Sequence, residues 1–229
     1  MLSKRKREAK QLIMKKIALI GASGFVGLAL LKESLERGHS VTAIVRHPEK
    51  ITIKHPRLHI MKGDVLSKPT VKELVSGMDV VISSYNPGWK NPTIAEDTTN
   101  AYKSIIEGVK EAEISRLLIV GGAGSLFISP EKREMDTDAI PESFMPAVKS
   151  LAEVLYSLQK NEHELDWVFF SPAANIAPGE KKGVYRLGKD NMIVNDKGES
   201  NISVEDYAAA MLNEVENPQH HKERFTIGY

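Results

Sequence analysis

Three glycines stand at even spacing where an apolar run gives way to a helical pattern: Gly21, Gly24 and Gly27. Glycine loses conformational entropy and side-chain packing in such a place, so its repeated use indicates that the main chain must be bare there. Between a strand and a helix, the first glycine allows a tight turn, the second lets the backbone approach a pyrophosphate, and the third lets the helix pack closely on the strand. The N–H groups and the positive end of the helix then hold the phosphates. The stretch therefore predicts a dinucleotide site.

The end of the second apolar run indicates which dinucleotide is bound. A site for NAD generally has Asp or Glu there, about 20 residues beyond the glycines, to bond the ribose 2′-hydroxyl. This chain reads TAIVRHPEK, with Arg46 and no acid before Glu49. A carboxylate would repel a 2′-phosphate, whereas a guanidinium pairs with it and stacks on adenine. We therefore expect NADP(H) in preference to NAD(H), with a solvated Arg46 as the alternative interpretation.

Further polar and aromatic residues follow the ends of later apolar runs. Asp64 ends the third run, where its carboxylate either accepts a bond from the adenine amino group or caps the next turn. Ser83 and Ser84 end the fourth run. In folds built from alternating strands and helices, ligands bind at the sheet edge formed by the carboxyl ends of the strands. The next segment would pass near the nicotinamide ribose and supplies candidate pocket residues, namely Tyr85, Asn86 and Trp89.

These residues have to be positioned by regular elements, and apolar runs rich in β-branched residues alternate with helical patterns along the chain. The runs predict strands at 16–21, 40–46, 58–64, 79–84, 116–122, 166–172 and 224–229. The helical patterns lie at 25–37, 70–77, 94–112, 143–160 and about 203–216. Such alternation is typical of right-handed βαβ units, so we expect an α/β, doubly wound parallel sheet with both faces covered, which is a Rossmann fold.

Two segments depart from this alternation. Residues 173–202 contain Gly-rich turns and short strands, and we expect them to form a small C-terminal, substrate-side lobe within one domain that spans 15–229. The basic stretch 1–14 is expected to be an extension before the first strand. In the helix at 143–160, Ser143 is the expected N-cap, Pro146 falls in the first turn, and the apolar stripe is 144, 148, 151, 155 and 158.

Composition excludes several classes of function. The 229 residues include 31 basic and 30 acidic side chains, so no charge excess points to nucleic acid or an anionic membrane. No cysteine is present, which excludes disulfides and thiolate metal sites. No apolar run approaches the roughly 20 residues that span a bilayer. We expect a cytoplasmic monomer or homodimer without a metal and without nucleic-acid or membrane partners.

The motifs together resemble the short-chain dehydrogenase/reductase superfamily, from about residue 15 to the C-terminus. The resemblance rests on GASGFVG, on Arg46 at a strand end, on GD at 63–64, on LLIVGGAGS in the fifth strand and on ISVEDYAAAM near the end. Within that superfamily, the chain is similar to the atypical branch. This branch includes NAD(P)H-flavin reductase-like proteins, biliverdin reductase B-like enzymes, NmrA-type redox-sensing regulators and proteins named NAD-dependent epimerase/dehydratase.

The resemblance also shows a departure. The wider superfamily uses a Ser after the fifth strand and a Tyr-x-x-x-Lys pair on the following helix. Ser125 matches the Ser and Lys149 matches the lysine, which would face the nicotinamide ribose, but the position four earlier is Met145. Methionine cannot donate a proton, so the acid that ordinary carbonyl reduction needs is missing. A solvated Lys149 is the alternative interpretation.

A flavin acceptor removes the need for that acid, because its N5 takes hydride directly and solvent later supplies a proton. The protein then has to hold donor and acceptor stacked at short range. We expect an NADPH-dependent oxidoreductase that reduces a flavin or a similar planar, conjugated acceptor. Two alternatives stay open: a redox sensor that binds NADP(H) without turnover, and a sugar- or steroid-type epimerase/dehydratase with a relocated acid such as Tyr85.

The expected site residues form three groups. Ser125 and Lys149 are the catalytic candidates, and Ser125 would orient the acceptor. The loops around Trp89 and at 171–179 would shape a planar slot, with Tyr85, Asn86, Trp89 and Asn175 as substrate contacts. The expected cofactor contacts are Gly21, Ser23, Gly24, Phe25, Val26, Gly27, Arg46, Asp64, Val65, Ser83, Ser84, Lys149 and Pro172.

Overall fold

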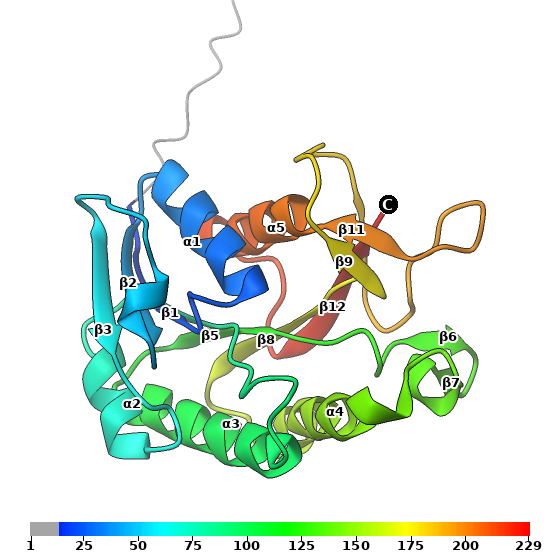
Figure 1. Cartoon of the computed structure of the whole chain (residues 1–229), viewed down its shortest axis with the longest axis horizontal. Coiled ribbons are helices and arrows are strands. Elements are labelled where there is room, and N and C mark those ends of the chain that lie inside the picture. Colours follow the sequence, from blue (N-terminus) through cyan, green and yellow to red (C-terminus); the bar gives the residue numbers. More distant parts are fainter. Residues whose placement is uncertain (1–13) are drawn as a thin grey trace, which may run out of the picture.

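The computed structural model describes residues 14–229, so the expected basic extension 1–14 lies outside the described residues apart from Met14. Its centre is an eight-stranded sheet in the order β10-β12-β8-β5-β4-β1-β2-β3, drawn in Figure 1. All neighbouring pairs are parallel except β10 with β12. The strands are β1 (Lys16–Ile20), β2 (Ser40–Val45), β3 (Leu58–Lys62), β4 (Val80–Ser83), β5 (Arg116–Val120), β8 (Asp166–Ser171), β10 (Arg186–Gly188) and β12 (Glu223–Gly228).

Five α-helices cover the two faces of this sheet. One face carries α1 (Phe25–Glu36) and α5 (Val204–Glu216), and the other carries α2 (Lys68–Val75), α3 (Ile94–Glu111) and α4 (Met145–Asn161), as Figure 1 shows. Successive residues of β1 alternate between the faces, since Ile17 and Leu19 pack in the core under α1 while Ala18 and Ile20 pack in the core under α3. Burial on both faces explains why the strands read as unbroken apolar runs. The prediction of a doubly wound α/β fold is confirmed.

Several local features differ from the expected pattern. Only the short 3₁₀ helix η1 (Pro48–Lys50) connects β2 and β3. The loop after β5 contains a hairpin of β6 (Phe127–Ser129) and β7 (Lys132–Arg133), followed by the 3₁₀ helix η2 (Glu134–Asp136). The expected N-cap Ser143 is wrong, because it lies inside a 3₁₀ helix, η3 (Glu142–Phe144), that runs directly into α4. Pro146 is in the first turn, as expected.

The segment 173–202 lies over the carboxyl end of the sheet on the side of α5. It contains β9 (Asn175–Ala177), which pairs in parallel with β11 (Asn201–Ser203) in a separate two-stranded sheet. It also contains β10, which forms one edge of the main sheet. Asp206, fully buried in the first turn of α5, accepts hydrogen bonds from the N–H groups of Lys182 and Gly183 and from the Tyr229 hydroxyl. These bonds outweigh the effect of burial and hold the pKa of Asp206 below its usual value. The loop is thus fixed to the domain core.

An ion-pair network joins the opposite, amino ends of the strands to α5. Arg116 begins β5 and is only 8% exposed; its guanidinium pairs with Asp166 at the start of β8 and with Glu214 of α5 at 2.6 Å. His220 contacts Glu214 at 2.9 Å, and His221 contacts Asp166 at 3.0 Å. We call these five residues the amino-edge network. It braces the sheet against α5.

Candidate active site at the carboxyl edge of the sheet

The glycine turn between β1 and α1 is bare because the neighbouring main chain leaves no room for side chains. Gly21 has φ +79°, and a Cβ there would lie 2.6 Å from the carbonyl oxygen of Ser84. A Cβ on Gly27 would lie 2.1 Å from the carbonyl oxygen of Gly21 and 2.7 Å from the Ser84 Oγ. Gly24 differs, since it is exposed and a Cβ there would meet only the Gly21 oxygen, at 3.3 Å. Gly21 and Gly27 therefore allow close packing, and Gly24 keeps the outer side of the turn open, as a pyrophosphate requires.

Ser84 braces this turn from the end of β4. Its hydroxyl donates a hydrogen bond to the carbonyl oxygen of Ile20 at 2.9 Å and lies 3.2 Å from that of Gly21. Ser83 is fully buried, and its Oγ accepts a bond from the Tyr85 N–H at 3.4 Å. Of this expected pair, the structure brings only Ser84 to the wall of the cavity described next.

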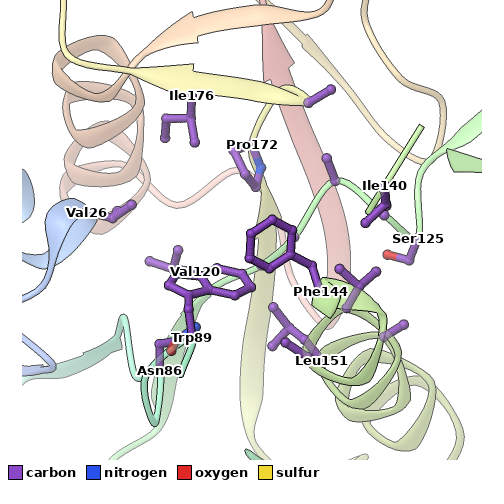
Figure 2. A pocket seen from close by; sticks show the side chains of 18 of the residues that line it. Val26, Asn86, Trp89, Val120, Ser125, Ile140, Phe144, Leu151, Pro172 and Ile176 are labelled. Carbon is purple, nitrogen blue, oxygen red and sulfur yellow. The ribbon is translucent and has the colours of Figure 1, made fainter. Parts of the chain in front are cut away.

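A cavity of about 500 Å³ opens beside the glycine turn, at the carboxyl ends of β1, β4, β5 and β8. Its walls are mainly apolar, and Figure 2 shows side chains from several elements facing a common space. Of the expected residues, the following line it: Gly24, Phe25, Val26, Gly27, Ser84, Tyr85, Asn86, Trp89, Ser125 and Pro172. Wall residues outside the expected set include Val120, Glu134, Ile140, Phe144, Val148 and Leu151, and Ile176 lies in the loop at 171–179 that was expected to shape the slot.

Two aromatic side chains that contact each other line this cavity. The rings of Trp89, from the loop after β4, and Phe144, at the end of η3, meet edge to face with centroids 5.2 Å apart. Trp89 is 60% exposed and Phe144 is 41% exposed, although both are large apolar side chains. Figure 2 shows the two side chains close together in front of the strands. Exposed aromatic rings on segments from two sides of a cavity are suited to contact a flat ligand.

Polar groups on the cavity wall are few. Ser125 is 4% exposed and lies in the loop after β5. Burial raises the pKa of Glu134, and burial also raises that of Tyr85, which the nearby Arg46 guanidinium partly offsets. Both groups therefore hold their protons to higher pH than usual. Within residues 14–229, no group of three or more His, Cys, Asp or Glu side chains is arranged to hold a metal ion.

The structure does not bring Lys149 to the cavity. The α4 residues on the wall are Ala147, Val148, Leu151 and Ala152, preceded by Phe144. Lys149 follows Val148 by about 100° around the helix and is exposed. Helix positions four apart that both face the cavity, such as Phe144 and Val148, carry apolar side chains. This side of the cavity thus offers neither the lysine that the resemblance implied nor a proton donor in its place.

Asn175 is also outside the cavity. Its side-chain amide donates to the Oδ1 of Asn201 at 2.9 Å, which joins β9 to β11. The next residue, Ile176, points to the other side of the strand and lines the cavity, because strand side chains alternate. The expected contact is therefore displaced by one residue, whereas Pro172, at the end of β8, lies on the wall as Figure 2 shows.

The residues expected to hold the adenosine half lie apart from the cavity. Arg46 is exposed at the end of β2 and donates to the carbonyl oxygen of Pro87 at 3.2 Å. The carboxylate of Asp64 accepts a bond from the Leu66 N–H at 3.0 Å, which is the turn-capping alternative. Val65 is buried beside it, and Ser23 is half-buried within the glycine turn.

Comparison with known proteins agrees with this geometry. Residues 21–218 match a protein family described as NAD(P)H-binding. The chain belongs to this NAD(P)H-binding family. Among sequence relatives, the uncharacterised protein YwnB of Bacillus subtilis is 42% identical over 217 residues, which cover 93% of this chain and 97% of that protein.

Two solved structures are similar to this chain in fold and sequence. One is a candidate epimerase from Bacteroides thetaiotaomicron, with a TM-score of 0.89 and 56% identity over 94% of this chain and 97% of that one. The other is a candidate NADH-flavin reductase from Streptococcus pneumoniae, with a TM-score of 0.81 and 35% identity over 93% and 99% of the two chains. The expected resemblance to atypical short-chain dehydrogenase/reductase proteins is confirmed. In the described part of this NAD(P)H-binding protein, no helix has the length and apolar character needed to span a membrane.

Proposed function

We propose that the protein is an NADPH-dependent oxidoreductase that transfers hydride to a flavin or a similar planar, conjugated acceptor. The observation that carries this proposal is the position of an apolar cavity, with an exposed aromatic pair, directly beside the glycine turn. The family membership supports a nicotinamide nucleotide in the turn, since the match begins at Gly21. When bound, the reduced nicotinamide supplies a hydride ion.

The protein's own contribution is to bind, orient and exclude water. The N–H groups at the start of α1 and the open side of Gly24 would hold the pyrophosphate, and Arg46 would pair with the 2′-phosphate of NADPH. The expected contacts Ser23, Phe25, Val26, Val65 and Ser84 complete the proposed nucleotide site, whereas Asp64 caps the next turn. The proposed site leaves out Lys149, which is exposed on α4, and Ser83, which is buried outside the cavity wall.

The acceptor would lie against the apolar walls, between the aromatic pair and the sheet edge. Trp89 and Phe144 offer ring faces or edges to a planar molecule, and Val148 and Leu151 offer an apolar floor. The α4 wall has no acid that would protonate an alkoxide in step with hydride transfer. This favours an acceptor that takes hydride first and a proton from solvent afterwards.

The decisive experiment mixes the purified protein with NADPH and riboflavin and follows the near-ultraviolet absorbance of the reduced nicotinamide. We expect saturable NADPH binding by calorimetry and NADPH oxidation that depends on both protein and riboflavin. Binding without oxidation would instead favour the redox sensor. Absence of binding by any nicotinamide nucleotide would overturn both functions.

An epimerase or dehydratase is a second candidate, favoured by the position of Tyr85 on the cavity wall and by its raised pKa, which keeps the phenol protonated. Tyr85→Phe separates the two. Under the leading proposal, the variant oxidises NADPH with riboflavin at a rate within about threefold of wild type, because loss of a positioned acid costs 10²-fold or more only where that acid acts. A loss of about 10²-fold would make Tyr85 a proton donor and contradict the proposal that solvent supplies the proton.

A further inference from the structure

A buried arginine holds the loop that carries Ser125. Arg224, in β12, is 5% exposed, and its Nη1 donates to both the carbonyl oxygen and the Oγ of Ser125, at 2.9 and 3.0 Å. Its Nε and Nη2 donate to the Oδ1 of Asp190, at 2.9 and 2.5 Å. The guanidinium is therefore fixed on both sides, and Ser125 receives a hydrogen bond from a cation.

The same loop is tied to its surroundings by the main chain. The N–H of Phe127 donates to the carbonyl oxygen of Asp190 at 2.9 Å, and the N–H of Met192 donates to that of Phe127 at 2.8 Å. Met135 N–H bonds the carbonyl oxygen of Gly124 at 2.9 Å. Asp190 thus contacts Arg224 through its carboxylate and the Ser125 loop through its backbone. The Ser125 loop is therefore held by bonds to its main chain on both sides of the serine, as a positioned hydrogen-bond donor requires.

These bonds determine which way the Ser125 hydroxyl proton is directed. An Oγ that accepts from Arg224 uses one lone pair, and its own hydrogen is then available as a donor. Among residues 14–229, the structure gives this hydrogen no acceptor, and Figure 2 shows the Ser125 oxygen directed toward the cavity beside Ile140. A hydroxyl that accepts a bond from a cation is also a stronger donor, because bonds in a chain polarise one another.

We propose that Arg224 is a positioning residue that, with Asp190, orients the Ser125 hydroxyl as the hydrogen-bond donor to the acceptor in the cavity. The inference rests on the proposed function and deepens it. The hydroxyl donates to a carbonyl oxygen of a riboflavin-like acceptor at the edge where negative charge develops. No covalent bond to Ser125 forms, the serine proton stays on its oxygen, and the proton that completes reduction comes from solvent.

The electrostatic reason for this arrangement is that the mainly apolar cavity wall carries few hydrogen-bond donors, and one of them, Ser125, accepts a bond from a buried cation. Hydride brings two electrons to the acceptor, and a fixed donor in a water-poor site stabilises the resulting charge. Arg224 places a positive charge next to that donor, since its guanidinium hydrogen-bonds the Ser125 Oγ, and Arg224 itself does not line the cavity. Asp190 neutralises the guanidinium only in part, since its side chain is 52% exposed and solvent screens it.

The test uses four variants together with wild type: Ser125→Ala, Arg224→Met, Arg224→Lys and the double variant Ser125→Ala/Arg224→Met. Arg116→Lys is the matched control, because Arg116 is another buried arginine in an ion-pair network but lies at the opposite end of the strands. Thermal unfolding and NADPH calorimetry check that each variant folds and binds the nucleotide. Kinetics with riboflavin give kcat and KM, and infrared spectroscopy of bound, oxidised riboflavin reports the carbonyl stretch without turnover.

We expect Ser125→Ala and Arg224→Met each to lower kcat by about 10²-fold, the loss typical of one oxyanion donor, with little change in NADPH affinity. The double variant should be no slower than Ser125→Ala, since both changes remove the same interaction. Arg224→Lys should recover part of the rate, and the riboflavin carbonyl stretch should move to higher frequency in Ser125→Ala and Arg224→Met alike. Arg116→Lys should lower stability only.

Other outcomes overturn the inference. If Arg224→Met folds and keeps the wild-type kcat and carbonyl stretch, or if the two losses add in the double variant, Arg224 does not act through Ser125. If Arg224→Met does not fold, Arg224→Lys and Ser125→Ala are compared instead. An unchanged riboflavin carbonyl stretch in both of these variants then overturns the inference. A wild-type protein that binds NADPH but neither binds nor reduces riboflavin overturns the proposed function as well, whereas normal riboflavin reduction by every variant overturns this inference alone.

Discussion

The two ends of the parallel strands carry opposite kinds of chemistry. At the amino ends, the amino-edge network brings together Arg116, two carboxylates and two histidines, most of them shielded from solvent. At the carboxyl ends, a cavity with mainly apolar walls adjoins a turn that has no side chains at Gly21, Gly24 and Gly27. A dense cluster of titratable groups is usually a good pointer to an active site. In our proposal the cluster instead has a structural role, and the functional end is the one with bare main chain and apolar walls.

The difference follows from what each end has to do. The amino-edge network joins β5, β8 and α5, and its charged groups pair with one another, although the Nε of Arg116 and the Oδ1 of Asp166 are buried without a hydrogen-bond partner among residues 14–229. Under the proposed function the carboxyl end has to receive a ligand, and its cavity has mainly apolar walls with few polar groups. The following substitutions test whether the two ends separate stability from binding.

The largest expected effect is on stability, from Arg116→Met at the amino edge. Removing the guanidinium leaves Glu214 and Asp166 without their cationic partner, and breaking a buried pair in this way costs about 3–5 kcal/mol. We expect denaturant unfolding to show a loss of this size while calorimetry shows unchanged NADPH affinity in the folded protein. A variant with wild-type stability would contradict the bracing function of the network.

Gly27→Ala should show the reverse pattern. The added methyl group would meet the carbonyl oxygen of Gly21, so α1 must move away from the turn, and NADPH affinity should fall by about tenfold or more, with a stability loss of about 1–3 kcal/mol. Gly108→Ala is the matched control, since its methyl group would meet the Val71 Cβ at 2.7 Å where α3 packs on α2. This control should lose similar stability and keep its affinity. Equal affinity losses in both variants would show that the turn is not the nucleotide site.

Arg46→Glu sharpens the comparison within the carboxyl end. The change removes a charge-assisted hydrogen bond worth about 1.5–3 kcal/mol and adds repulsion toward a 2′-phosphate. We expect NADPH to bind about tenfold or more weakly and NADH to be little affected. Arg57→Glu, an exposed arginine just before β3 at the amino edge, should change neither affinity. Parallel losses for NADPH and NADH would contradict the assignment of Arg46 to the 2′-phosphate.

The smallest effect is expected for Glu134→Gln, on the cavity wall. Burial raises the pKa of Glu134 above its ordinary value of 4.5, so the native state favours the protonated form and the ionised form opposes folding. Wild-type stability should therefore fall as pH rises from 4.5 through the raised pKa, and the variant should not share this loss. At neutral pH we expect the variant to be more stable by about 0.5 kcal/mol, with no difference below pH 4.5. A variant that is more stable than wild type only at acid pH would contradict a raised pKa for Glu134.

The fold was predictable because its signals are local. Apolar runs and helical periodicity located the seven parallel strands and the five helices to within a few residues. The antiparallel edge strand β10 and the hairpin of β6 and β7 were not located, because short strands are defined by partners far away in the sequence. The Ser143 cap failed for a different reason: a 3₁₀ turn precedes α4 and moves its start to Met145.

The candidate site was predictable where one local motif defines it. It was less predictable where the side of a helix or strand that a residue faces determines whether the residue lines the cavity. The glycine turn and the loop with Trp89 follow from sequence. Lys149 and Asn175 each neighbour a wall residue, Val148 and Ile176, but a shift of one position turns a side chain to a different side of a helix or strand. Arg224 gave no signal at all, since its contact with Ser125 joins positions 99 residues apart.

The placement of the aromatic pair also gives the protein a built-in optical probe. The chain has two tryptophans. Trp167 is 1% exposed in the core, whereas Trp89 stands beside Phe144 at the cavity and is 60% exposed. Emission from Trp89 should be quenched when a coloured ring compound enters the cavity, while emission from Trp167 should change mainly when the core melts. With Trp89→Phe and Trp167→Phe as single-fluorophore versions, occupancy and unfolding become two separate signals in one cuvette.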